Sequence, residues 1–540
     1  MKNELIVQRF DALFAERQAS VDGVWTDIER YVLPLRGEFY TSHDNENQTD
    51  WDRSEIYDST AVVAAQSLAA SMQANITSFS QQWFDLKFRD DELNSDDTAM
   101  EWLEEVGSRI YDALVESNFD VEIAECYIDL AGYGTSVLFE EEIDGELVFT
   151  EIPLRDCVFE ENSRKQVNCL YRRIWMTPLQ MQDKFGEDIP DKIKEMIDSP
   201  QAGIEKQEVI FCVYPRKENK EIDISKPVAP KSRPFGYKFI CKANKELLGE
   251  EGGYYEMPAY VTRWAKTGGS KWGHSPAINC IADIRTLNLL KDATLTAAGK
   301  AIDPAMIAED GTVMGDLDLD RGGLTVVTDI NGLKPFESGT KFDVANMEIG
   351  MLIDSIRKTF FQDQLELKES PAMTATEVNV RYELMQRLLG PVVARLKTDL
   401  LDPFIQRTFN ILYRRGDIPE VPEGMDANIN TEYNGVLPRS QKAETALQMR
   451  GYVESLAGLA EIFPQMLDVV NPDEMARELA ILQGVPAKTL NSQEEIDQKR
   501  QAQQQAQQQQ EQIMTAQAGG DAMKALGEGG AALKAVEGGQ

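Results

Sequence analysis

The sequence predicts an α+β protein that is mainly helical and ends in a low-complexity tail. Apolar residues recur at helical spacing near both ends of the chain. The middle third alternates as strands do and contains the turn pair Asp144-Gly145. After Asn491, glutamine, alanine and glycine dominate, and these residues bury little apolar area. At roughly 100–200 residues per domain, the 540 residues suffice for three or four structural regions.

The first third opens with three predicted helices. A run of helical spacing covers residues 4–32, and Pro34 ends it. Asp58-Ser59-Thr60 supply N-cap side chains for a second helix, whose many small residues allow a neighbouring helix to approach closely. A third helix is predicted over residues 97–117, where apolar residues recur on one face.

Strands follow in the middle of the chain. Residues 136–142 and 146–152 flank Asp144-Gly145, and this pair favours a type I′ hairpin because both residues tolerate a positive φ. Further strand-like runs cover residues 167–175, 209–214, 237–243 and 259–264. Residues 1–275 are therefore predicted to form a mixed α+β region.

The second half alternates long helices with short breaks. Ser275-Pro276 gives an N-cap followed by proline at the first helical position, which predicts a helix over residues 276–301. Residues 302–343 are dense in glycine and aspartate, and Asn331-Gly332 between two apolar runs predicts a hairpin there. A second helix is expected over residues 344–361.

A longer helix is predicted over residues 374–416. Its start is the capping box Thr374-Ala-Thr-Glu377, and its interior contains Gly390-Pro391 and Asp402-Pro403. Because proline removes a helical hydrogen bond and clashes with the preceding turn, the helix is expected to be kinked at one or both places. Residues 417–490 begin with a proline-rich connection and return to helix.

The tail, residues 491–540, contains a glutamine run and two similar pieces bounded by glycine. These pieces are Ala522-Met-Lys-Ala-Leu526 and Ala532-Leu-Lys-Ala-Val536. Glutamine and alanine permit helix without supplying a core, so partial helix and mobility are expected.

Composition limits the classes of function. The chain has 55 Lys and Arg against 91 Asp and Glu, a formal net charge of −36, so nucleic acid could be held only through a local basic patch. The first residues lack the apolar run of a signal peptide, and no apolar stretch is long enough for a membrane helix. Six scattered cysteines form no CxxC pair, which indicates core thiols in a reducing cytoplasm.

Catalytic motifs are absent. His43 and His274 are the only histidines, and Gly273-His-Ser-Pro-Ala277 lacks the second glycine of a nucleophile elbow. No phosphate-binding loop occurs. Asp316-Leu-Asp-Leu-Asp320 resembles the start of a calcium loop, but Arg321 replaces its required glycine. We therefore expect no catalytic residue, cofactor or metal.

Several stretches, in this order, resemble the podovirus-type head-to-tail connector (portal) family of bacteriophages, and the resemblance covers nearly the whole chain. They are residues 56–72 with 83–86, 132–140, 262–264 with 272–276, 287–290, 373–378, and 389–391 with 400–407. The resemblance implies a non-enzymatic ring, usually of twelve subunits, at one capsid vertex. DNA would enter and leave through its channel.

The family's regions carry over onto this chain as expectations. A wing comprises residues 1–275 together with the kinked helix 374–416. Helices 276–301 and 344–361 form the stem, and 302–343 the clip between them. Residues 362–373 form the tunnel loop, 417–490 the crown, and 491–540 a tail directed into the capsid.

The resemblance also implies partners and DNA-facing residues. The partners are other copies of the chain, terminase, tail adaptor proteins, and the major capsid and scaffolding proteins, in the host cytoplasm during assembly and then in the virion. Double-stranded DNA would pass non-specifically, and no membrane is involved. The expected site residues are Asp363, Gln364, Leu365, Glu366 and Lys368 in the tunnel loop, Arg357 and Lys358 in the stem, Gly390 and Pro391 at the kink, and Asn331 and Gly332 in the clip hairpin.

Two alternatives remain open at this point. One is an enzyme, which the missing motifs disfavour. The other is a scaffold or internal virion protein that assembles without a channel. Surface ion pairs of Arg357 and Lys358 with Asp354 or with neighbouring subunits are an alternative to DNA contact by those two residues.

Overall fold

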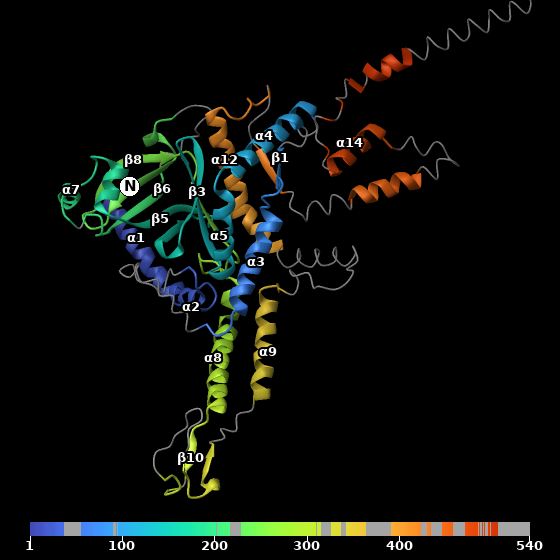
Figure 1. The fold of residues 1–540 in the computed structure, drawn as a ribbon. Helices are drawn as coiled ribbons and strands as arrows, with labels where there is room; N and C mark the ends of the chain where they lie inside the picture. The colour runs from blue at the N-terminus through green and yellow to red at the C-terminus, as the bar shows by residue number, and fades with distance from the viewer. Residues whose placement is uncertain are drawn as a thin grey trace, which may run out of the picture. The chain divides into compact units, whose positions relative to one another are not determined.

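The structure is a computed structural model (Figure 1). Its chain divides into two compact units. The first unit comprises Met1–Leu86, Val106–Glu420 and Asn428–Arg439, and the second comprises Lys87–Glu105, Val421–Ala427 and Ser440–Gln540. The structure describes residues 1–36, 56–89, 93, 96–200, 202–216, 228–308, 310–314, 326–335, 342–362, 390–422, 429–433, 445–456, 470–483, 485, 489, 491, 495–496 and 498–505.

The three predicted N-terminal helices are present. The first is interrupted by a π-helical turn, Gln18–Asp22, which separates α1 (Asn3–Arg17) from α2 (Gly23–Tyr31). The other two are α3 (Thr60–Ile76) and α4 (Asp97–Glu116). The prediction missed α5 (Phe119–Gly132), because this helix is buried on most sides and its apolar residues follow no single stripe.

A three-stranded antiparallel sheet has the order β3-β2-β9. The predicted hairpin is confirmed: β2 (Thr135–Ile143) and β3 (Glu146–Glu151) are joined by Asp144 and Gly145, whose φ angles are 52° and 85°. The third strand is β9 (Ala259–Arg263), which pairs with the other edge of β2.

A five-stranded antiparallel sheet has the order β4-β5-β6-β7-β8. Its strands are β4 (Cys157–Glu161), β5 (Val167–Met176), β6 (Gln207–Pro215), β7 (Phe235–Cys241) and β8 (Glu246–Tyr254). Two short helices, α6 (Pro178–Phe185) and α7 (Asp191–Ile197), lie between β5 and β6 in the chain. The prediction of an α+β class is confirmed, although β4, β8 and the strand β1 (Phe84–Phe88) were not predicted.

The five-stranded sheet has a core on each face. On one face, Phe10 and other apolar residues of α1 pack against β4, β5, β6 and β7. On the other face, α6 and α7 cover Val209, Cys241 and Leu248. Val209 and its neighbour Ile210 belong to different cores because successive side chains of a strand point to opposite faces.

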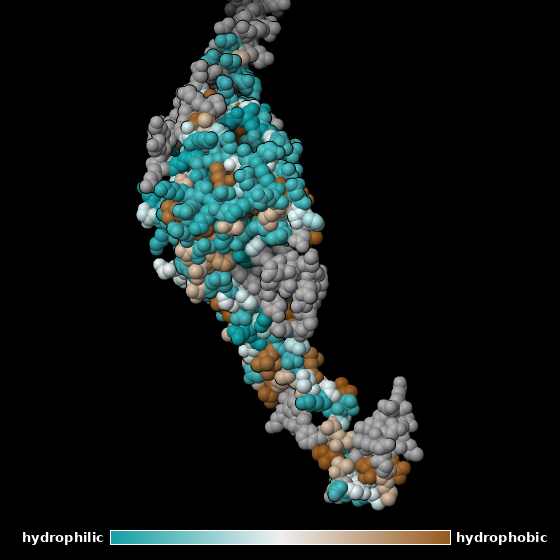
Figure 2. Space-filling view, turned by 90° about the vertical axis from the view of Figure 1, so that its left-hand side faces the viewer, coloured by the Kyte–Doolittle hydropathy of each residue, from teal (hydrophilic) through white to brown (hydrophobic). Residues whose placement is uncertain are grey.

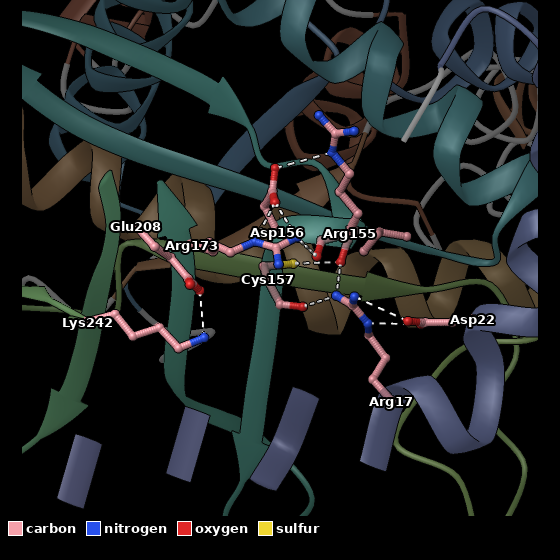
Figure 3. Close-up of polar contacts among 9 residues, drawn as sticks. Arg17, Asp22, Arg155, Asp156, Cys157, Arg173, Glu208 and Lys242 are labelled. Carbon is pink, nitrogen blue, oxygen red and sulfur yellow. Dashed lines mark hydrogen bonds and ion pairs between the residues drawn. The ribbon is translucent and has the colours of Figure 1, made fainter. Parts of the chain in front are cut away.

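Side chains bind backbone groups at three of the four sheet edges, those of β4, β3 and β8. At β4, the buried Arg17 donates from Nη1 to the Cys157 carbonyl at 2.9 Å and from Nε to Asp22 at 2.9 Å (Figure 3). At β3, Asn118 donates to the Phe149 carbonyl and accepts from the Phe149 amide, each at 2.8 Å. At β8, Arg216 donates to the Gly252 carbonyl at 2.8 Å.

Two long helices of the first unit lie side by side: α8 (Pro276–Ile302) and α9 (Phe342–Thr359) (Figure 1). They match the predicted helices 276–301 and 344–361 to within two residues at each end. Between them in the chain, β10 (Met306–Ala308) pairs with β11 (Leu333–Pro335), and Val313 forms a single bridge with Val327.

The predicted clip hairpin at Asn331 and Gly332 is wrong in its pairing. The two residues lie in a 3₁₀ turn, Ile330–Gly332, neither has a positive φ, and the strand that follows pairs with β10. The glycine has another role: a Cβ at Gly332 would lie 2.6 Å from the Thr312 side chain, so close packing requires glycine there.

The predicted long helix is described only from Gly390 onward, and residues 374–389 lie outside the described residues. Gly390 and Pro391 are helical where the description begins. A π-helical turn, Lys397–Leu401, precedes α12 (Asp402–Arg415), so Pro403 stands in the first turn of α12. The π-helical turn shifts the hydrogen bonding just before Pro403 and accommodates its missing amide, which explains why the chain stays helical through the proline.

The rest of the described chain is mainly helical. Strand β12 (Ile429–Tyr433) is followed by a helix over residues 445–456 and by α14 (Pro472–Gln483). In the tail, residues 498–505 are helical. Short 3₁₀ turns occur at Leu154–Asp156 and Pro230–Ser232.

Candidate functional site

The start of α8 is fixed to the sheets by a close backbone approach. The Ser275 hydroxyl accepts from the Ile278 amide at 3.0 Å, as an N-cap does, and donates to the Gly132 carbonyl. Gly134 has a φ of 79°, and a Cβ there would lie 2.7 Å from the Ser275 nitrogen. Only glycine satisfies both conditions, so the β2 end of the sheet and the helix start are held in one geometry.

The middle of α8 is anchored to neighbouring helices. The Asn288 side-chain oxygen accepts from the amides of Tyr57 and Asp58 at 2.9 and 3.2 Å, just before α3. The Ser355 hydroxyl of α9 donates to Asp283 of α8 at 2.9 Å. These contacts fix the first half of α8 and the last turns of α9.

Beyond Asn288 the character of the helix pair changes. We call residues 289–351 the distal arm; among its described side chains only Thr312 and Ile349 are buried. Apolar residues at the lower end of the face in Figure 2 belong to this arm. Its exposed large apolar residues are Leu289, Leu295, Ile302, Ile307, Met314, Val326, Val344, Met347 and Met351. So many exposed large apolar residues in one part of a subunit indicate an interaction site.

The predicted basic pair lies at the end of α9. Arg357 and Lys358 are exposed in the last turn, where the helix dipole favours cations. Their neighbours Ile356 and Phe360 are fully buried and fix that turn. Within the described chain neither cation forms an ion pair with Asp354, which disfavours that part of the alternative interpretation.

The predicted tunnel-loop residues Asp363, Gln364, Leu365, Glu366 and Lys368 lie outside the described residues. The described part of the structure therefore does not bring them together with Arg357 and Lys358. Their assignment as DNA-facing residues stays a prediction.

A buried ionic network, missed by the sequence analysis, joins α12 to the three-stranded sheet. Arg407 Nε lies 3.3 Å from Glu140 Oε2, and the Thr408 hydroxyl donates to the same carboxylate at 3.0 Å. The Tyr260 hydroxyl is a further donor. Burial raises the pKa of Glu140, and Arg407 and the two hydroxyl donors oppose that rise.

A signal for this network was present in the sequence. Glu140 follows Val137, Leu138 and Phe139 in a predicted strand, and a carboxylate among buried residues requires a partner. The partner could not be identified, because Arg407 is far away in the chain.

A second ionic contact fixes the π-helical turn before α12. Arg263 of β9 is buried and lies 3.2 Å from Asp399 Oδ2 within that turn. Arg263 also pairs with Glu161 of β4. The C-terminal part of the long helix is thus bound to both sheets at fixed points.

The described residues hold no group of three or more His, Cys, Asp or Glu side chains that could bind a metal ion. All six cysteines are buried free thiols. Among the helices described, none is both long and apolar enough to span a membrane. His274 pairs with Asn279 at 2.9 Å, and His43 lies outside the described residues.

Comparison with known proteins gives a consistent result. Residues 3–490 match the family described as bacteriophage head to tail connecting protein. A probable portal protein of Bordetella phage BPP-1 is 26% identical over 502 residues, covering 90% of this chain and 88% of that protein. A portal protein of Salmonella phage epsilon15 is 25% identical over 543 residues, covering 98% of this chain and 96% of that protein.

Proposed function

Because this chain belongs to the family of bacteriophage head to tail connecting proteins, its function is that of a portal in phage DNA packaging, and we propose that it works as a ring-shaped channel at one capsid vertex. The family is structural, and its members are components of the virion that assemble with themselves and with other head and tail proteins. The ring would be a dodecamer, as the family resemblance implies.

The observation that best supports this proposal is the exposure of apolar side chains on the distal arm. Its apolar side chains lack a covering layer within the described subunit, and Ile302 and Leu295 are 85% and 57% exposed. A ring repeats one heterologous contact, in which a face of each copy meets a different face of the next. Burying these residues against neighbouring copies removes apolar surface from water and supplies the driving force for assembly.

The regions of the chain then take the following roles. Helices α8 and α9 form the stem, 302–343 the clip, and 1–275 with 374–416 the wing. Residues 362–373 form the tunnel loop, 417–490 the crown and 491–540 the tail. The hydrogen bonds of Ser275 and Asn288 support the assignment of a stem and a wing, because they fix the first half of α8 to the rest of the unit.

DNA would pass through the ring without being bound tightly. The chain's net charge of −36 opposes phosphate binding, and Arg357 with Lys358 would add one ring of weak contacts at the end of the stem. Terminase and tail adaptor proteins would bind the outer end of the ring, and capsid and scaffolding proteins would surround the ring. DNA would be ejected through the same channel.

Native mass spectrometry and negatively stained images test the proposal. The wild-type chain should form closed rings near twelve copies with a central hole, and the double variant Leu295→Asp, Met347→Asp should remain as smaller species. Ile204→Asp is the matched control, because Ile204 is 78% exposed outside the arm and its change should leave rings intact.

A stable wild-type monomer at micromolar concentration would refute ring formation. Assemblies without a hole would instead support the scaffold or internal virion protein.

A further inference from the structure

An apolar groove lies within the second unit, between the helix over residues 445–456 and α14. Its volume is about 800 Å³, within the range of ligand-binding pockets. Its lining is almost wholly apolar and includes Val453, Leu456, Val470, Met475, Leu479 and Val485.

The described residues of these two helices form no core of their own. Among the described residues from 445 to 505, only Ala446 is buried. Val453 and Val485 in the groove are 38% and 39% exposed. An amphipathic helix is stabilised mainly by packing of its apolar face, so the groove requires an additional apolar layer.

The two tail repeats supply side chains of a suitable kind. Met523 and Leu526 in the first repeat, and Leu533 and Val536 in the second, are spaced three residues apart. At that spacing two side chains lie on the same face of a helical turn. Glycines bound each repeat, so neither belongs to a longer apolar segment that could fold on itself. Residues 506–540 lie outside the described residues.

The last described helix of the chain contacts the first turn of α14. Arg500, in the helix 498–505, donates to Asp473 of α14 at 2.6 Å, and Asp473 lies at the start of the helix that lines the groove. Residues 506–521, 16 in number, lie between Gln505 and Ala522, and a coil of that length would have an r.m.s. extension of about 20–24 Å. Because α14 is only about 18 Å long, the repeats can reach every part of the groove.

The charges of the repeats and of α14 also favour the tail repeats as the occupant of the groove. Each repeat places a lysine, Lys524 or Lys534, between its two apolar side chains. The exposed Glu474 and Glu478 of α14 alternate with the groove residues Met475 and Leu479. A repeat with its apolar pair in the groove can therefore place its lysine beside these carboxylates.

We propose that this groove is the docking site for the chain's own C-terminal repeats, residues 522–526 and 532–536. Tethering raises the effective concentration of the repeats to the millimolar range, so a weak contact suffices to keep the groove occupied. Two equivalent repeats serve one groove in each subunit. The tail thereby completes the apolar layer that the described helices lack.

The test uses full-length protein and a fluorescein-labelled synthetic peptide of residues 519–540, followed by fluorescence anisotropy. A tail variant changes Met523, Leu526, Leu533 and Val536 to Asp, which leaves the groove open. It should bind the peptide, and the wild-type protein should bind it at least tenfold more weakly because its own repeats compete.

Groove residues are tested in the tail-variant background. Leu479→Asp should weaken peptide binding at least tenfold, and Leu479→Ala should weaken it less. Leu447→Asp is the matched control, since Leu447 is 67% exposed on a groove-forming helix but does not line the groove. Circular dichroism of each variant checks that its helices persist. If Leu479→Asp loses helix, weaker peptide binding by Leu479→Ala than by the Leu447→Asp control decides whether the peptide binds in the groove.

Three results would overturn the proposal. Equal peptide binding by wild type and tail variant would show that the native groove is open. No binding by the tail variant would show that something else, such as the helices of a second copy, covers the groove. Equal binding by the Leu479 and Leu447 variants would place the peptide elsewhere.

Discussion

The two sheets and the distal arm belong to the same compact unit but are stabilised in different ways. The sheets have an apolar core on each face of the larger sheet, and their edge groups are paired with side chains such as Arg17 and Asn118. The arm has almost no buried side chain within the described subunit. The sheets therefore fold on their own contacts, whereas the arm's apolar residues are available for association.

This comparison predicts that substitutions in the sheets change the stability of the subunit, whereas substitutions in the arm change its assembly. The free energy of unfolding of each variant is measured by urea denaturation with circular dichroism on dissociated subunits.

Arg407→Ala should have the largest effect. It leaves the buried Glu140 carboxylate without its ionic partner, and breaking a buried pair in this way costs about 3–5 kcal/mol. The control is Arg9→Ala, whose exposed pair with Glu160 contributes about 0–1 kcal/mol. Equal losses in the two variants would show that the buried network is not a main support of the sheets.

Gly134→Ala should cost about 2 kcal/mol or more, because it combines a positive φ with a Cβ 2.7 Å from the Ser275 nitrogen. Gly145→Ala is the matched control: its φ is 85°, but no atom lies within 4 Å of the added Cβ, so about 1 kcal/mol is expected. The difference between the two isolates the close approach of sheet and α8; no difference would mean that α8 can shift freely.

Glu251→Gln should cost about 1 kcal/mol near neutral pH. Burial alone would raise the pKa of Glu251, but hydrogen bonds from Arg216, Tyr214 and Lys238 outweigh it and lower this pKa to about 2. A depressed folded-state pKa contributes stability above the unfolded value of 4.5, and this is lost as the pH falls toward 2. The gap between wild type and variant should therefore close over that interval, and a gap independent of pH would contradict the assignment.

Leu295→Ala and Ile302→Ala should change the free energy of unfolding by less than about 0.5 kcal/mol, because both side chains are exposed in the subunit. The same variants should weaken ring assembly in native mass spectra. A large loss of subunit stability would show that the arm packs within its own chain.

Local signals predicted the elements with strong boundaries. The cap Ser275-Pro276 and the turn Asp144-Gly145 both determine backbone geometry within a few residues, and both predictions are confirmed. Strand β8 was missed because Gly249, Gly252 and Gly253 weaken its strand pattern. These glycines are required by neighbours distant in sequence: a Cβ at Gly252 would meet the Tyr237 ring at 2.2 Å.

The site was less predictable than the fold. Asn331-Gly332 has the composition of a hairpin turn, but Gly332 serves a contact with Thr312, which only the folded chain defines. The Glu140–Arg407 pair likewise depends on how α12 crosses the sheet. Resemblance supplied the portal function, since no catalytic or binding motif in the chain would have indicated it.

The occupied sheet edges have a consequence for a protein that works in many copies. A ring holds its subunits permanently at very high local concentration, and an open strand edge under those conditions invites backbone pairing between neighbours. Arg17 at β4, Asn118 at β3 and Arg216 at β8 already take backbone carbonyls that such pairing would use. In the proposed ring, crowded subunits would thereby be protected at these three edges from pairing into a continuous intermolecular sheet.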